Sequence, residues 1–314
     1  MTVLSRFLSQ NKSLIGLIAL IVAVSLASPN FLKLENLLNV LRQTSINAAI
    51  AMGATFVILT GGIDLSVGAI LALAGAFAAT LIAGGHGLAS TMLLVLLAGV
   101  AIGAVSGLLV TYGAVQPFIA TLVSMTVLRG IVLVFSNGTP IDSSGGDASA
   151  AFATIGDGYV LGLPIPVIIA AIVFAGCWVA LTQTRFGRYV YAIGGNENVA
   201  RLSGVNVTLV KISVYAVSGL LSALAGIILT ARLESAQPTA GLGYELDAIA
   251  AVVVGGTSLA GGIGSMTGTL IGSLIIGVLS NALNLLDVSS YYQLITKGCV
   301  ILLAVLVDRQ ARST

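Results

Sequence analysis

Residues 90–111 read Ser90-Thr-Met-Leu-Leu-Val-Leu-Leu-Ala-Gly-Val-Ala-Ile-Gly-Ala-Val-Ser-Gly-Leu-Leu-Val-Thr111 and contain no charged side chain. A helix needs about 20 mostly apolar residues to cross roughly 30 Å of membrane hydrocarbon, so this run is long enough. Its glycines Gly99, Gly103 and Gly107 are four residues apart and lie on one helix face. Since lipid provides no hydrophobic force between helices, close backbone approach at small residues must hold them together. The run therefore predicts a membrane-spanning helix packed tightly on a neighbour.

The composition of the whole chain agrees with this prediction. Of its 314 residues, 57% are hydrophobic and 8% are charged, and the mean hydropathy is +1.10. An ordinary soluble domain carries about 25% charged residues, so a soluble fold of this size lacks the charges to cover its surface. The net charge of +2 is too small for a nucleic-acid partner, and one histidine with two cysteines excludes a His/Cys metal cluster or a disulfide framework. The fold class is therefore all-α, a polytopic transmembrane helical bundle.

About ten spans are predicted along the chain. The apolar runs are continuous rather than alternating, which excludes a barrel of transmembrane strands. The first and eighth spans are short, and the ends of these two are the least sharply defined. The spans are 14–27, 44–60, 66–83, 90–111, 117–136, 164–182, 212–232, 247–260, 265–286 and 290–307. Together they form a single transmembrane domain over residues 1–314, with no soluble domain.

The positive charges predict the orientation of the spans. With the N-terminus inside, eight Lys and Arg residues fall on the cytoplasmic side and three on the outside, which is the expected bias. Both termini are then cytoplasmic. The inner eight are Arg6, Lys12, Arg185, Arg188, Arg201, Lys211, Arg309 and Arg312; the outer three are Lys33, Arg42 and Arg232. An alternative is that the first span is a cleaved signal peptide, with cleavage near Ser25–Ala27.

The longest polar stretches between spans are residues 28–43, 137–163, 183–211 and 233–246. The second of these contains three aspartates and no Lys or Arg, and it is rich in glycine. This composition predicts an irregular loop on the outer, periplasmic side.

A weak internal repeat links residues 48–72 with 248–272. Both copies contain Gly-Gly-Ile-x-x-x-x-Gly, at 61–68 and at 261–268. With the orientation above, the two copies run in the same direction through the membrane. Either they are two related halves around a central pathway, as in many transporters, or a composition rich in small residues produces the match.

The cytoplasmic segment 183–211 contains the signals of a short helix. Asn196 is a favourable N-cap, Glu197 places negative charge at the positive end of the helix dipole, and Gly204 suits the position after the helix end. Val199 and Leu202 are three residues apart and share a face. A two-turn helix is marginal alone, so this one either caps the protein's own cytoplasmic face or docks on a partner.

At this point a resemblance becomes specific. Runs over nearly the whole chain, from about residue 12 to 308, resemble the sugar permease subunits of ATP-binding-cassette importers. These runs are 47–68, Gly187-Arg-Tyr-Val-Tyr-Ala-Ile-Gly-Gly-Asn-Glu197, Arg201-Leu-Ser-Gly204, 235–250, Gly255-Gly-Thr-Ser-Leu-Ala-Gly-Gly-Ile-Gly264 and Ser289-Ser-Tyr-Tyr-Gln293. The resemblance implies a non-catalytic transport subunit that imports a monosaccharide across the bacterial inner membrane. D-ribose is the favoured sugar, with xylose, galactose or a sugar-like signal as alternatives.

The resemblance also implies the partners and a coupling site. The expected partners are a second copy of the chain, an ATP-binding cassette ATPase, a periplasmic sugar-binding protein and the lipid bilayer, with no nucleic acid. The segment 183–211 would hold the helix that couples to the ATPase, with Gly194, Gly195, Asn196, Glu197, Arg201 and Gly204 as its residues. We expect no cofactor and no metal, and the sequence contains no Gly-x-x-x-x-Gly-Lys-Ser/Thr loop that would bind nucleotide phosphates.

A sugar is neutral and rich in hydroxyls, so its path needs hydrogen-bonding side chains. The candidate residues are Gln43, Asn47, Thr121, Ser124, Asn281 and Asn284, as three pairs at helical spacing, together with Asp64. The alternative for each pair is hydrogen bonding between helices, which such residues commonly provide in membranes. Asp64 or Ser66 would cap the third span, or Asp64 would form a polar contact at the inner gate.

The charged residues bear on two rival functions. No acidic residue falls firmly within a predicted span, which argues against an ion-coupled secondary transporter. Arg129 lies within the fifth span, where it snorkels, pairs with an outer carboxylate or lines the path, and Lys297 is expected to snorkel. An intramembrane enzyme is disfavoured because no His, Asp or Ser residues show catalytic spacing.

Overall fold

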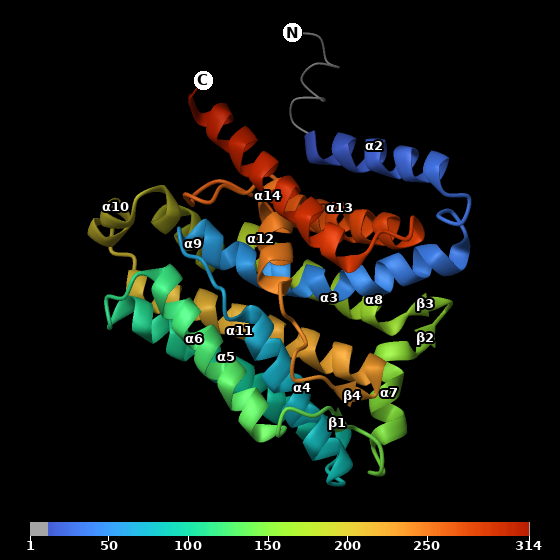
Figure 1. Ribbon diagram of the computed structural model, residues 1–314. Helices are drawn as coiled ribbons and strands as arrows, with labels where there is room; N and C mark the ends of the chain where they lie inside the picture. The colour runs from blue at the N-terminus through green and yellow to red at the C-terminus, as the bar shows by residue number, and fades with distance from the viewer. Residues whose placement is uncertain (1–11, 314) are drawn as a thin grey trace.

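The computed structural model of the chain describes residues 12–313. The expected cytoplasmic position of Arg6 therefore lies outside the described residues. The helices, labelled in Figure 1, are α2 (Lys12–Ala27), α3 (Leu34–Leu59), α4 (Val67–Ala83), α5 (Leu88–Thr111), α6 (Pro117–Phe135), α7 (Ser149–Asp157), α8 (Ile165–Gln183), α9 (Arg185–Gly195), α10 (Glu197–Leu202), α11 (Val207–Leu233), α12 (Tyr244–Val254), α13 (Met266–Leu285) and α14 (Ser290–Ser313). The strands described are β1 (Ile141–Asp142), β2 (Tyr159–Val160), β3 (Leu163–Pro164) and β4 (Ser235–Ala236).

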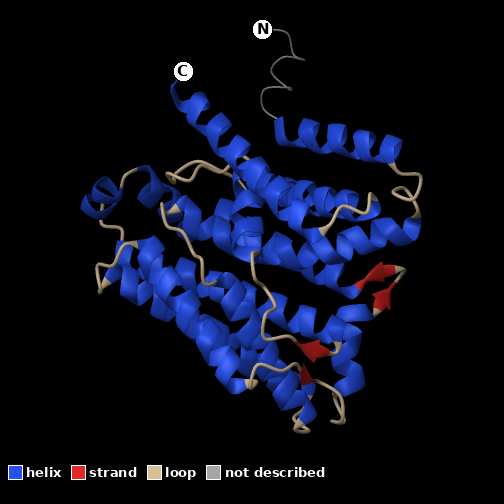
Figure 2. Cartoon of the chain, in the orientation of Figure 1, coloured by secondary structure: helices blue, strands red, loops and turns tan. Residues whose placement is uncertain are grey.

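The prediction of a helical membrane protein is confirmed. Within residues 12–313, five helices, α5, α6, α8, α11 and α13, are long and apolar enough to cross a membrane, and Ser13–Ala27 and Val67–Ala83 are shorter apolar helices. Figure 2 shows helices through most of the molecule, with the two pairs of short strands on one side of the view.

Four predicted span boundaries differ from the helix ends by five residues or more: the starts of the second and seventh spans and the ends of the eighth and tenth. The second span was expected to begin at residue 44, but α3 begins at Leu34, so much of the expected polar stretch 28–43 is helical. Its polar residues have partners on other elements, which a reading of hydropathy alone does not reveal: Asn36 exchanges hydrogen bonds with Asn281, and Arg42 pairs with Asp157. The eighth span was expected to reach residue 260, but α12 ends at Val254.

The glycine stripe of α5 packs on α11, as the sequence predicts. A methyl group at Gly103 would overlap the carbonyl oxygen of Tyr215, and one at Gly99 would crowd Ala223 and Gly219. Gly107 lies in the same way against Ile212. Because only hydrogen fits at these three places, the backbones of α5 and α11 approach more closely than larger side chains would permit.

The two ends of the bundle are distinct. One end, here called the α10 end, carries α9 and α10; the other, the α7 end, carries α7 and the strands (Figure 1). At the α7 end, Ile141 pairs with Ala236 and Asp142 with Ser235, so the stretches 137–163 and 233–246 are joined. The stretch 137–163 is expected to be irregular, but part of it forms α7, a nine-residue helix that packs on α11 and α8. The expectation is wrong for this part.

The two copies of the internal repeat adopt the same local form. In each, a helix ends, a glycine turn follows and a second helix begins: α3 and α4 are joined by residues 60–66, and α12 and α13 by residues 255–265. Gly61 and Gly261 both have a positive φ, +78° and +86°. The Gly262 amide donates a hydrogen bond of 2.9 Å to the Leu59 carbonyl at the end of α3, and a methyl group at Gly261 would lie 2.9 Å from the Gly61 amide nitrogen. The two connections, here called the paired turns, therefore touch each other.

Candidate functional site

The segment between α8 and α11 holds two helices rather than the one expected. The unexpected helix is α9, which begins where the Thr184 hydroxyl accepts a hydrogen bond of 3.3 Å from the Gly187 amide. Its buried residues are Gly187, Val190 and Ile193, which recur every three positions. This spacing is visible in the sequence and could have predicted α9, since it places one face of a helix on the bundle.

The helix predicted at Asn196–Gly204 is present as α10, and both of its predicted ends are confirmed. The Asn196 side chain accepts a hydrogen bond of 3.1 Å from the Val199 amide, as an N-cap does. At the other end Gly204 has φ +84°, and its amide donates to the Arg201 carbonyl. Ala200 is buried, so α10 is held against the rest of the protein as well as capped.

Glu197 is the ionic centre of this segment. Its carboxylate accepts hydrogen bonds from Arg201 at 2.9 Å and from Lys211 at 2.5 Å. The bond from Lys211 is the main reason that the pKa of the Glu197 carboxyl lies below its ordinary value. Lys211 belongs to α11, so this contact ties α10 to the helix that follows it. The sequence gives no sign of this contact, because a separation of 14 residues across a turn produces no periodic signal.

The outward side of this segment presents apolar side chains. Val199, Leu202 and Leu209 are 57%, 89% and 60% exposed, and Arg201 is also exposed. The shared face expected for Val199 and Leu202 is thus turned away from the protein's own core. The three side chains are here called the α10 surface.

Another part of the segment, α9, contacts the second paired turn and the end of α3. The Tyr191 hydroxyl donates a hydrogen bond of 2.8 Å to the Gly264 carbonyl. Gly194 lies so close to Leu59 and Gly262 that a methyl group there would overlap their backbone atoms, whereas one at Gly195 would meet nothing within 4 Å. Of the six residues expected to couple to an ATPase, Gly194 therefore faces inward, and Gly195 and Asn196 are exposed.

Asp64 lies in the first of the paired turns and is buried. One carboxylate oxygen accepts hydrogen bonds from the Ser66 amide at 3.0 Å and the Ser66 hydroxyl at 2.6 Å, and the other accepts from the Ser218 hydroxyl at 2.7 Å. Asp64 thereby fixes the turn before α4 and attaches it to α11. The alternative cap, the Ser66 side chain, makes no capping bond to α4.

Four of the candidate path residues bond to neighbouring helices or turns. The Thr121 hydroxyl donates to the Ile63 carbonyl at 3.1 Å, and the Ser124 and Ser106 hydroxyls are 3.1 Å apart. The Asn281 and Asn36 amides exchange bonds of 3.0 and 2.9 Å, and Asn284 accepts from Gln293 at 2.8 Å. Such contacts are the alternative expected for polar residues in a membrane bundle.

The remaining candidate pair lies on α3. Gln43 is exposed and Asn47 is half-buried. The candidate path residues are thus spread over contacts between different helices, and the structure does not gather them into one site.

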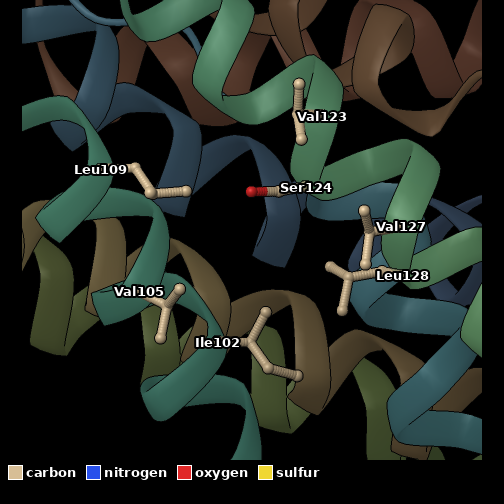
Figure 3. Close-up of a pocket in the computed structure, with 7 residues that line it drawn as sticks. All are labelled: Ile102, Val105, Leu109, Val123, Ser124, Val127 and Leu128. Atoms are coloured by element: carbon tan, nitrogen blue, oxygen red, sulfur yellow. The ribbon is translucent and has the colours of Figure 1, made fainter. Parts of the chain in front are cut away.

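A cavity of about 240 Å³ lies between α5 and α6 and includes one candidate residue, Ser124 (Figure 3). Its other lining residues are aliphatic, among them Ile102, Val105 and Val123. A sugar needs several hydrogen-bonding partners, and one hydroxyl among methyl groups does not supply them. This cavity therefore does not fit a polyol.

Intramembrane charges are paired or bonded rather than snorkelling. Lys297 was expected to snorkel, but it forms an ion pair of 2.8 Å with Asp247, which joins α14 to α12. Arg129 donates to the carbonyls of Pro238 and Ala240, both at 2.8 Å, and so holds the stretch 233–246. Two acidic residues are buried, Asp64 in the turn before α4 and Asp247 in the first turn of α12.

Comparison with known proteins identifies relatives over nearly the whole chain. Residues 36–305 match the family described as branched-chain amino acid transport system / permease component. The ribose import permease protein of Haemophilus influenzae is 59% identical, with 97% of this chain and 94% of the relative covered. The ribose import permease protein of Bacillus subtilis is 57% identical, covering 94% and 91%. The D-allose transport system permease protein of Escherichia coli is 43% identical, covering 93% and 90%. No solved structure matches the chain.

Proposed function

Because the chain belongs to the family of permease components of the branched-chain amino acid transport system type, we propose that it is the membrane-spanning subunit of an ATP-driven importer that carries D-ribose across the bacterial inner membrane. The observation that carries this proposal is the 59% identity to a ribose import permease over 97% of the chain. Identity falls to 43% for the D-allose permease, so ribose is favoured over other sugars.

We propose ten spans with both termini cytoplasmic. Setting aside α7, α9 and α10, the described helices number ten, of which α12 is the shortest with 11 residues. Alternating their directions places the α10 end in the cytoplasm and the α7 end outside. The contacts support this arrangement, because the paired turns touch Gly194 at one end and β1 pairs with β4 at the other. The domain is single, with 183–211 as its cytoplasmic coupling segment and 137–163 as its periplasmic loop.

The α10 surface is the proposed contact with the ATPase. Its apolar side chains, Val199, Leu202 and Leu209, suit an apolar groove on the partner. Arg201 on the same helix, together with Arg185 and Arg188 in the first turn of α9, favours an acidic rim around that groove. Asn196 and Gly204 fix the ends of α10, and a short rigid helix carries the motion of its partner better than a flexible loop does.

The other partners follow from the same proposal. Two copies of the chain would enclose the path, a periplasmic binding protein would deliver ribose to the α7 end, and ATP would be hydrolysed in the partner ATPase. Among the path candidates we place Gln43 and Asn47 first. Asp64, Thr121, Ser124, Asn281 and Asn284 come second, because they already bond within the protein.

Reconstitution tests the proposal directly. The chain is placed in vesicles with its cognate ATPase and ribose-binding protein, and uptake of labelled ribose, allose and xylose is measured with and without ATP. We expect uptake that requires ATP and both partners and that is greatest for ribose. Uptake by the chain alone, or uptake abolished by a protonophore while ATP is held constant, would instead support a secondary transporter.

A further inference from the structure

One face of α9 lies on the second paired turn and on the end of α3, where the first paired turn begins. Tyr191 and Gly194 are three residues apart on this face, and each contacts a paired turn. Tyr191 donates a hydrogen bond of 2.8 Å to the Gly264 carbonyl in the turn between α12 and α13. Gly194 lies against Leu59, the last residue of α3, and against Gly262. This pair of residues, here called the inner face of α9, is therefore the place where the segment 183–211 contacts both halves of the repeat.

The contact at Gly194 is made by backbone atoms. A methyl group at Gly194 would overlap the Leu59 carbonyl oxygen and the Gly262 amide nitrogen. The same two groups bond to each other, the Gly262 amide donating to the Leu59 carbonyl at 2.9 Å. A methyl group at Gly262 would in turn lie 2.9 Å from the Gly195 amide. Three segments far apart in the sequence thus meet here without intervening side chains.

A backbone contact of this kind transmits displacement well. Side chains can change rotamer and absorb a small shift, whereas close-packed backbone cannot, so neighbouring elements must move together or separate. The first paired turn connects α3 to α4, and the second connects α12 to α13. Both α3 and α12 pack against several other helices. A shift of α9 therefore acts on four helices at once.

Two further contacts hold α9 in this position. The Phe186 ring lies 5.8 Å from the Phe56 ring of α3, centroid to centroid, which attaches the beginning of α9 to the same helix that Gly194 meets at its end. At its C-terminus α9 is followed by Asn196, the N-cap of α10, so α9 and α10 are joined without a loop. Figure 1 shows the two helices together at the α10 end.

We propose that the inner face of α9 is the joint through which movement of the docked α10 reaches the helices around the sugar path, with Tyr191 and Gly194 as positioning residues. This inference rests on the proposed function, because it presumes an ATPase that moves α10. It adds that docking and transmission belong to different helices: the α10 surface binds the partner, and α9 passes the motion inward.

The experiment uses the full chain in vesicles with its ATPase and ribose-binding protein, and its readout is ribose imported per ATP hydrolysed. The first variant, Tyr191→Phe, removes only the hydroxyl that bonds Gly264, and Tyr189→Phe is the matched control because Tyr189 is exposed on the same helix. The second variant, Gly194→Ala, adds one methyl group at the contact. Its matched control is Gly176→Ala on α8, where a methyl group also meets nothing within 4 Å.

We expect Tyr191→Phe to lower the ribose-to-ATP ratio roughly threefold to tenfold, which corresponds to one lost hydrogen bond. Gly194→Ala should lower the ratio further, while both controls keep the wild-type ratio. Each variant should still co-purify with the ATPase, because the α10 surface is unchanged. Should Gly194→Ala fail to fold, Tyr191→Phe and its control decide the matter.

An unchanged ratio in Tyr191→Phe and in folded Gly194→Ala would overturn the inference. A melting temperature that fell in these variants while the ratio stayed unchanged would assign the residues a structural role alone. Failure of the proposed function is recognised separately, since the wild-type chain with its partners would then show no ATP-dependent ribose uptake at all.

Discussion

Lys211 on α11 forms an ion pair of 2.5 Å with Glu197 on α10, across a turn of the chain. The Lys211 side chain is only 18% exposed, whereas Arg201, the other partner of Glu197, is 64% exposed. An exposed ion pair contributes little, because water screens it, and a half-buried, hydrogen-bonded pair contributes more. The contact to Lys211 is therefore the one that fixes α10 relative to α11.

Reversal of the charge at Glu197 should uncouple transport from ATP hydrolysis. Glu197→Lys removes a charged hydrogen bond, which contributes about 1.5–3 kcal/mol, and places two positive charges together. We therefore expect the amount of ribose imported per ATP hydrolysed to fall about tenfold. The doubly reversed variant Glu197→Lys/Lys211→Glu should regain most of the ratio. Arg201→Glu should lower the ratio of ribose to ATP less, since the ion pair between Arg201 and Glu197 is exposed. Equal losses in the single and double variants would contradict an ion-pair role.

The same pair predicts a pH dependence of α10. The pKa of the Glu197 carboxyl is lowered from 4.5 because Lys211 donates a hydrogen bond to its charged form. A lowered pKa means that the contribution to stability is complete above pH 4.5 and is lost as the pH falls through the lowered value. Hydrogen exchange of residues 197–204 should therefore accelerate in acid relative to α11. In Glu197→Gln the acceleration should be absent, and its persistence there would assign the effect to another group.

The glycine stripe of α5 predicts where bulk is not tolerated. Gly103→Leu would drive a side chain into the Tyr215 backbone of α11, and overpacking of this kind costs about 1–3 kcal/mol. We expect a lower melting temperature in detergent. Gly176→Leu on α8 is the control, because a side chain there meets nothing within 4 Å. Equal melting temperatures for the two variants would show that α5 does not pack on α11 through this face.

Substitutions at Asp64 test whether this residue holds a turn in place or forms a gate. Asp64→Asn and Ser218→Ala each remove part of the buried hydrogen bonding that holds the first paired turn to α11. We expect each to destabilise the chain by about 1–3 kcal/mol, with ribose uptake per folded molecule unchanged. Asp147→Asn, at an exposed aspartate, should have no effect. Loss of uptake in Asp64→Asn at an unchanged melting temperature would instead place Asp64 at the gate.

Local signals in the sequence predicted part of the fold and part of the site. The stripe at Gly99, Gly103 and Gly107 correctly placed a packed face, because helical spacing depends only on neighbouring residues. Asn196 and Gly204 correctly marked the ends of α10 for the same reason, since a cap is formed within a few residues.

Other features, which the sequence did not reveal, depend on residues far apart in the chain. The first turns of α3 fall in a stretch expected to be polar and to lie between spans, because the partners of Asn36 and Arg42 are the distant Asn281 and Asp157. Lys297 was expected to snorkel, because its partner Asp247 is 50 residues away. Proximity of this kind is a property of the folded chain, and no spacing within one segment reveals it.

Backbone contact between the paired turns has a consequence for natural variation in this family. Since the Gly262 amide bonds the Leu59 carbonyl and both lie against Gly194, a residue inserted into either turn would force the other apart. Insertions and deletions among homologues should therefore be scarce at 60–66 and 255–265 and should accumulate at the opposite end, in 137–163. An alignment of many sequences would reveal this asymmetry in gap positions without any biochemical measurement.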